Sequence, residues 1–211
     1  MNDFLQQISA SFSQMLGWEL LAVILAIAYL LLIMRENSLG WICALASTAI
    51  YTLLFWNVSL LMESALNMYY MGMAVYGWRQ WRTGGENHRG ISIQTWSIRR
   101  HLLIALILLT ATLISGYLLS NNTRAAWPYL DSFTTWASVL TTYMVAKKVL
   151  ENWLYWILID SISMFLYAER GLYLTALLFA GYLLICVFGY LNWRKSLVGK
   201  FETQSGTGQL D

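Results

Sequence analysis

Residues 151–167, ENWLYWILIDSISMFLY, have the length and hydrophobicity of a membrane-spanning helix but carry a carboxylate, Asp160, in the middle. Side chains three and four positions apart share one face of a helix, so one polar and aromatic stripe runs along this segment. Its members are Trp153, Trp156, Asp160, Ser163 and Tyr167. A charged side chain at the bilayer centre costs about 2.5–3.5 kcal/mol even on the mildest insertion scale. We therefore expect Asp160 to face protein or a water-filled cavity, and the stripe is our first candidate for a binding site.

The composition of the chain indicates an all-α membrane protein. Hydrophobic residues make up 58% of the chain and charged residues 11%, whereas roughly a quarter of the residues of a soluble domain are charged. Residues 1–34 contain no Lys or Arg, so the basic region of a cleavable signal peptide is missing and we expect the first helix to remain as an anchor. Apolar runs of about 17–25 residues, enough to cross a bilayer, predict seven transmembrane helices, near residues 18–34, 39–57, 60–82, 101–120, 131–149, 152–168 and 171–193.

The thirteen basic residues divide unequally between the two sets of loops that seven crossings create. Arg124 and Arg170 fall on one side of the membrane. Cytoplasmic loops carry the excess of Lys and Arg, so this distribution predicts an outside amino terminus and a cytoplasmic carboxyl terminus. The cytoplasmic side then holds the other eleven, Arg35, Arg79, Arg82, Arg89, Arg99, Arg100, Lys147, Lys148, Arg194, Lys195 and Lys200.

The first three and the last three predicted helices share a sequence pattern. A shift of 112 residues places Tyr70 on Tyr182, and a shift of 115 residues places Trp41 on Trp156, which we interpret as one short insertion in a loop. An even number of crossings separates equivalent helices, so the two halves run in the same direction. We predict a 3+1+3 parallel repeat related by an axis along the membrane normal, as in the SWEET sugar transporters.

This repeat predicts six segments along the chain. They are an outer interfacial segment (1–16), a first three-helix bundle (17–82), a flexible cytoplasmic loop (83–100), a linker helix (101–120), a second three-helix bundle (131–194) and a cytoplasmic tail (195–211).

If the two halves pack face to face, the polar and aromatic stripes of their second and third helices converge near the bilayer midplane. Aromatic faces attract cations, and carboxylates add direct negative charge. No Lys, Arg or His lies within the predicted helices at the depth of the carboxylates, which leaves their charge for a ligand. We expect a pocket for a flat cationic heteroaromatic compound, lined by Trp41, Glu63, Asn67, Tyr70, Trp153, Trp156, Asp160 and Tyr182.

Structural interpretations of the same residues stay open. Trp and Tyr concentrate at membrane interfaces, and polar side chains such as Asn67 can bridge helices for about 0.6–2 kcal/mol. A non-transporting membrane sensor or assembly subunit would use the stripes in this way. Residues interpreted as interfacial rather than ligand-binding are Trp18, Trp56, Trp127 and Trp193.

Nothing in the sequence indicates an enzyme. No His is combined with an acid and a Ser or Cys in a catalytic arrangement, and no metal-ligand spacing surrounds Cys43 or Cys186. The pair Gly84-Gly85 is not followed by the Lys-Ser/Thr of a phosphate-binding loop. We therefore expect no catalytic residues, cofactor, metal or nucleic-acid partner.

Two motifs together carry a family resemblance. The sequence ENWLYW at 151–156, followed by Asp160, Ser163 and Tyr167, combined with YGWRQW at 76–81, resembles the PnuC vitamin transporters. The resemblance implies seven helices in a 3+1+3 arrangement and a homotrimer in the cell inner membrane. It also implies uptake of nicotinamide riboside by facilitated diffusion, with a cytoplasmic kinase trapping the substrate by phosphorylation.

The resemblance also implies roles for particular residues. Two departures from the family pattern are Asn67 in place of a Gln four residues after Glu63, and Tyr190 at the position equivalent to Trp78. Related members carry thiamine or a flavin. Because nicotinamide riboside and thiamine both carry a ring cation, we place the first ahead and keep thiamine as the alternative. Ligand contacts fall on Trp41, Asn67, Trp153, Trp156, Asp160 and Tyr182, and motif or gate positions on Trp78, Trp81, Tyr190 and Trp193.

Overall fold

The computed structural model describes residues 17–57, 61–85, 90–123 and 127–207, which form seven helices and no β-sheet. The prediction of an all-helical chain with seven helices is confirmed for these residues, whereas the predicted interfacial segment 1–16 lies outside them. Four of the helices, α2, α3, α5 and α8, are long and apolar enough to cross a membrane by length and composition alone. The helices are α2 (Gly17–Met34), α3 (Gly40–Asn57), α4 (Leu61–Thr83), α5 (Ile98–Asn122), α6 (Pro128–Ala146), α7 (Asn152–Glu169) and α8 (Tyr173–Thr207).

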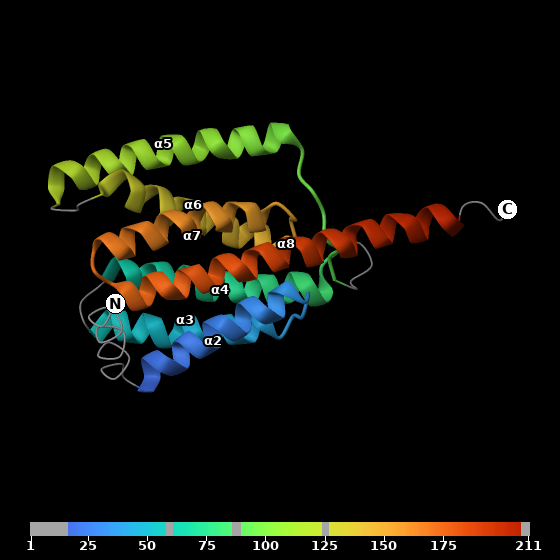
Figure 1. The fold of residues 1–211 in the computed structure, drawn as a ribbon, viewed down its shortest axis with the longest axis horizontal. Helices are drawn as coiled ribbons and strands as arrows, with labels where there is room; N and C mark the ends of the chain where they lie inside the picture. The colour runs from blue at the N-terminus through green and yellow to red at the C-terminus, as the bar shows by residue number, and fades with distance from the viewer. Residues whose placement is uncertain (1–16, 58–60, 86–89, 124–126, 208–211) are drawn as a thin grey trace, which may run out of the picture.

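The helices form two groups of three with α5 on the outside (Figure 1). Helices α2, α3 and α4 pack together, as do α6, α7 and α8, and the groups meet where α4 packs on α6 and where α2 packs on α8. Within the described part of the chain, α5 packs on α6. Figure 1 shows α8 continuing well beyond the bundle, so residues 195–207 of the segment predicted as a tail are helical.

The turns that follow α2 and α6 have the same backbone. Glu36 and Lys148 both take a left-handed conformation, with φ of 55° and 51°. In each turn, the N–H of the following residue donates a hydrogen bond to a carbonyl of the preceding helix. Asn37 N–H donates to the Leu32 carbonyl at 2.9 Å, and Val149 N–H donates to the Met144 carbonyl at 3.0 Å. Glu36 and Lys148 are 112 residues apart.

This offset corrects the predicted alignment of the second helices. The hydrogen-bonded turns lead into α3 at Gly40 and into α7 at Asn152. Trp41 and Trp153 each follow the first residue of their helix, so Trp153, and not Trp156, occupies the position that corresponds to Trp41. The predicted shift of 115 residues is therefore wrong. A shift of 115 also superposes the Glu-Asn pairs at 36–37 and 151–152, but these pairs lie at different positions relative to the two turns.

Each group packs a tryptophan of its second helix directly on a glycine of its third helix. A Cβ atom added to Gly77 would lie 2.5 Å from the ring of Trp41, and one added to Gly189 would lie 2.7 Å from the ring of Trp153. Glycine thus permits the close approach of α4 to α3 and of α8 to α7. The two contacts lie at the end of the bundle where α3 and α7 begin.

The described part of the connection between α4 and α5 is anchored to the second group. The Gln94 N–H donates to the Lys148 carbonyl at 3.0 Å, and the Leu150 N–H donates to the Gln94 carbonyl at 2.8 Å. Ile93 is 4% exposed and belongs to the main core cluster. Within the predicted loop, residues 93 and 94 are thus held against the second group by a buried side chain and by paired backbone.

We predict that Gly77→Ala destabilises the protein, because the new methyl group overlaps the Trp41 ring and overpacking costs about 1–3 kcal/mol. The matched control in the same helix is Gly72→Ala, where no atom lies within 4 Å of the added Cβ. Thermal unfolding of the two purified variants checks this. A melting temperature of Gly77→Ala equal to that of Gly72→Ala would contradict the packing.

Candidate functional site

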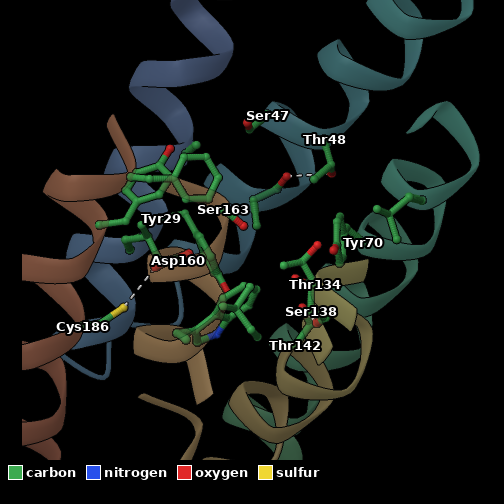
Figure 2. A pocket seen from close by; sticks show the side chains of 18 of the residues that line it. Tyr29, Ser47, Thr48, Tyr70, Thr134, Ser138, Thr142, Asp160, Ser163 and Cys186 are labelled. Atoms are coloured by element: carbon green, nitrogen blue, oxygen red, sulfur yellow. Dashed lines mark hydrogen bonds between the residues drawn. The ribbon is translucent and has the colours of Figure 1, made fainter. Parts of the chain in front are cut away.

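A cavity of about 420 Å³ lies between the two groups of helices. All the described helices except α5 contribute to its wall. Its volume is within the range of about 300–1,000 Å³ that is usual for small-molecule sites. Figure 2 shows side chains from several helices directed into this space.

Asp160 is the charged residue of the cavity wall. The residue is 4% exposed, and its Oδ2 atom accepts a hydrogen bond from the Cys186 thiol at 3.6 Å. No Lys, Arg or His is among the described residues that line the cavity. Within the described part of the chain, no three His, Cys, Asp or Glu side chains gather to hold a metal ion. The carboxylate therefore faces the cavity without a basic partner in its wall.

Aromatic rings from several helices surround this carboxylate. Tyr167 and Phe179 have ring centroids 5.2 Å apart, and Phe179 and Tyr182 have centroids 5.4 Å apart. Aromatic faces attract cations through their quadrupole, so the rings and the carboxylate favour the same kind of ligand. The aromatic residues of the wall are Tyr29, Trp41, Tyr70, Trp156, Tyr167, Phe179 and Tyr182.

The structure brings five of the eight predicted binding residues together on the cavity, namely Trp41, Tyr70, Trp156, Asp160 and Tyr182. Glu63 is exposed in the first turn of α4. Asn67 bonds within its own helix, to the Glu63 carbonyl at 2.9 Å. The face of α4 that lines the cavity carries Leu66 and Tyr70, and Asn67 is rotated about the helix axis by about 100° from Leu66 and about 60° from Tyr70.

The third predicted residue outside the cavity wall, Trp153, belongs to a buried aromatic cluster. Its ring meets Trp193 edge-on at 5.3 Å, Trp193 meets Trp81 at 5.8 Å, and Trp81 meets Trp41 edge-on at 5.6 Å. We call Trp41, Trp81, Trp153 and Trp193 the tryptophan cluster. Trp41 also lines the cavity, so the cluster borders the cavity at the end of the bundle where α3 and α7 begin.

Hydrogen bonds of the cluster cross reciprocally between the two groups of helices. The Trp81 Nε1–H of α4 donates to the Val145 carbonyl of α6 at 3.2 Å, and the Trp193 Nε1–H of α8 donates to the Ile33 carbonyl of α2 at 3.1 Å. Trp193 is completely buried, so its interpretation as an interfacial residue is wrong. Trp18, Trp56 and Trp127 are exposed, as interfacial residues are.

The two remaining motif residues lie outside the cluster. Trp78 is 38% exposed, with the Arg82 guanidinium 5.3 Å from its ring centroid. Tyr190 is half-buried against the main core.

An ion pair joins the two turns beside the cluster. Lys148 Nζ lies 3.1 Å from Glu36 Oε2 and 4.6 Å from the ring centroid of Trp81. Lys148 is 7% exposed. The pair therefore joins the turn after α2 to the turn after α6, two turns of similar backbone.

The sequence interpretation missed Tyr29 on α2, Ser47 on α3, Phe179 and Cys186 on α8, and the whole contribution of α6. Thr134, Thr135, Ser138 and Thr142 line the cavity, whereas the predicted site used the second and third helices of each half. The available signal was the spacing of four between Thr134, Ser138 and Thr142, which places three hydroxyl groups on one helical face.

Apolar helices that enclose a cavity lined by aromatic rings, hydroxyl groups and one buried carboxylate suit a membrane protein that binds a small molecule between its helices. The chain belongs to the family described as nicotinamide mononucleotide transporter, whose model matches residues 16–195. The resemblance to the PnuC transporters is thereby confirmed, and the protein is a multi-pass membrane protein.

Curated relatives and a solved structure agree with this assignment. The nicotinamide riboside transporter PnuC of Escherichia coli (strain K12) is 21% identical over 186 residues, which is 76% of this chain and 78% of that protein. The riboflavin/roseoflavin transporter RibM of Streptomyces davaonensis is 23% identical over 128 residues, or 58% of this chain and 59% of that protein. A crystal structure of the vitamin B3 transporter PnuC has the same fold, with a TM-score of 0.69, 21% identity and coverage of 91% of this chain and 87% of that one.

We predict that Trp81→Phe and Trp193→Phe each lower the melting temperature by several degrees. Each removes a hydrogen bond between the groups, worth about 0.5–1.5 kcal/mol, and leaves an unfilled volume in the core, which adds to the loss. Trp18→Phe, at a position 66% exposed, is the control and should melt like the wild type. Equal melting temperatures in all three variants would contradict the role of the cluster.

Proposed function

We propose that this protein imports nicotinamide riboside across the cell inner membrane. The observation that carries the proposal is Asp160, a buried carboxylate on an aromatic cavity with no base among the described lining residues. A ligand with a permanent ring cation would neutralise this carboxylate and stack on the surrounding rings. The proposal also draws on the relatives named as nicotinamide riboside transporters.

The family is described as a nicotinamide mononucleotide transporter, but the charges of the cavity favour binding of the riboside over binding of the mononucleotide. A phosphate monoester carries a charge of about −1.5 to −2 at neutral pH. The ring cation of the mononucleotide can pair with Asp160, but the phosphate would then be buried with no basic side chain in the described wall, and an unpaired buried anion is costly inside a protein.

Alternative substrates differ in how well they match the carboxylate. Riboflavin, named for the relative RibM, has an uncharged ring system and would leave Asp160 without a counter-ion. Thiamine carries a ring cation and stays the alternative within the family. The alternative of another class, a sensor or assembly subunit that does not transport, would use the polar residues only to hold helices together.

We propose that the two groups of helices are parallel repeats that move against each other during transport. The equal backbone of the two turns, the reciprocal tryptophan hydrogen bonds and the paired α4–α6 and α2–α8 contacts support this arrangement. Asp160 supplies charge, Trp41 and Trp156 stack on the ring, and the equivalent residues Tyr70 and Tyr182 flank it. Residues Trp78, Trp81, Trp153, Tyr190 and Trp193 belong to the gate region.

Transport is facilitated diffusion, with a cytoplasmic kinase trapping the product. The charge distribution supports a cytoplasmic location for the gate region, because Arg82, Lys147 and Lys148 lie at this end. The amino terminus is then outside and the carboxyl terminus inside. We also propose a homotrimer, for which the exposed apolar face of α5 offers a surface at Leu102, Leu106, Leu109 and Leu113.

We predict that Asp160→Asn weakens binding of nicotinamide riboside about 10-fold to 100-fold, because a hydrogen bond or ion pair to a charged group is worth about 1.5–3 kcal/mol. Isothermal titration of the detergent-solubilised protein and uptake into proteoliposomes measure this. Glu169→Gln, an exposed carboxylate at the end of the same helix, is the matched control and should bind like the wild type.

The same titration applied to nicotinamide mononucleotide, thiamine and riboflavin decides the substrate. We expect the wild type to bind the riboside most tightly and the mononucleotide most weakly. Unchanged affinity in Asp160→Asn would remove this residue from the site. No binding of any of these compounds would favour the non-transporting class.

A further inference from the structure

Three hydroxyl groups of α6 form one face of the cavity. Thr134, Ser138 and Thr142 follow one another at intervals of four and line the wall, and Thr142 is 7% exposed. In Figure 2 these labelled side chains lie together, across the cavity from Asp160 and Cys186. The wall therefore has a charged side and a hydroxyl side.

The protons of the two threonine hydroxyls are already used within α6. Thr142 Oγ1 donates to the Ser138 carbonyl at 2.8 Å, and Thr134 Oγ1 donates to the Asp131 carbonyl at 3.0 Å. A hydroxyl has one proton to donate and two lone pairs that accept. These oxygens consequently offer the cavity acceptors and not donors.

Two hydroxyl groups of α3 also donate their protons to backbone carbonyls. Thr48 Oγ1 donates to the Ala44 carbonyl at 2.8 Å, and Ser47 Oγ donates to the Ala22 carbonyl at 2.8 Å. Both residues line the cavity. Asp160 and these Ser and Thr oxygens thus offer acceptors, and the hydroxyls of the four tyrosines of the wall can both donate and accept. The hydroxyl groups of a ligand, which also donate and accept, match such a wall.

We infer that the hydroxyl face of α6, Thr134, Ser138 and Thr142, is the subsite for the sugar hydroxyls of a riboside, and that it sets the specificity for a glycosylated ring cation. The inference rests on the proposed function and adds to it. Asp160 and the aromatic rings select the cationic ring, whereas α6 recognises the polyol attached to it. A ring cation without a sugar makes only the first set of contacts.

The test compares two ligands that share the cationic ring, nicotinamide riboside and 1-methylnicotinamide, in which a methyl group replaces the ribose. The variant Thr134→Val/Thr142→Val keeps the side-chain shape and removes both oxygen acceptors. We expect its affinity for the riboside, measured by isothermal titration, to fall at least tenfold while its affinity for 1-methylnicotinamide stays within twofold. Thr142→Ser retains the oxygen and should bind the riboside like the wild type.

The control variant is Thr110→Val on α5, where Oγ1 makes the same kind of bond to its own helix, to the Leu106 carbonyl at 2.9 Å, on an exposed surface. It should bind both ligands like the wild type. If the double variant does not fold, the comparison of Thr142→Val with Thr142→Ser replaces it.

Two results would overturn the inference while the proposed function stands: an unchanged affinity of the valine variants for the riboside, or an equal loss for both ligands. A wild-type protein that does not bind the riboside at all would overturn the proposed function together with the inference.

Discussion

The structure depends on the cost of exposing a carboxylate to lipid. Asp160 lies in the middle of α7, and its burial at 4% exposure requires neighbours on every side that exclude acyl chains. Helices from both groups supply them, and the result is a cavity instead of a solid core. Apolar side chains of α2, α5 and α8 can then face outward, where exposed leucine and isoleucine residues are numerous.

A second constraint explains how the two groups of helices are joined. Tryptophan rings are large and their N–H groups need partners when buried. The N–H groups of Trp81 and Trp193 donate to carbonyls of the opposite group. The rings of Trp41 and Trp153 pack directly on glycines. These residues thereby fill the core and join the two groups, and Trp41 also lines the cavity.

The helices and part of the site could be predicted from the sequence because hydrophobic length and helical spacing are local properties. The spacing that linked Trp156 to Asp160 places both on the cavity wall. It did not distinguish Trp153, on the same stripe, which packs on Gly189 instead. The hydroxyl face of α6 was missed because serine and threonine resemble ordinary helix-bridging residues until the neighbouring helices are placed. Helix rotation and the beginning of α7 depend on tertiary contacts that spacing does not contain.

The chain's own cysteines permit the most direct test of the central claim, that a cationic substrate occupies the cavity beside Asp160. The chain has two cysteines, and Cys186 lines the cavity. In a Cys43→Ser background, we predict that the small cationic reagent 2-aminoethyl methanethiosulfonate modifies Cys186 and that saturating nicotinamide riboside slows this modification at least fivefold. A modification rate that the riboside leaves unchanged would contradict the account.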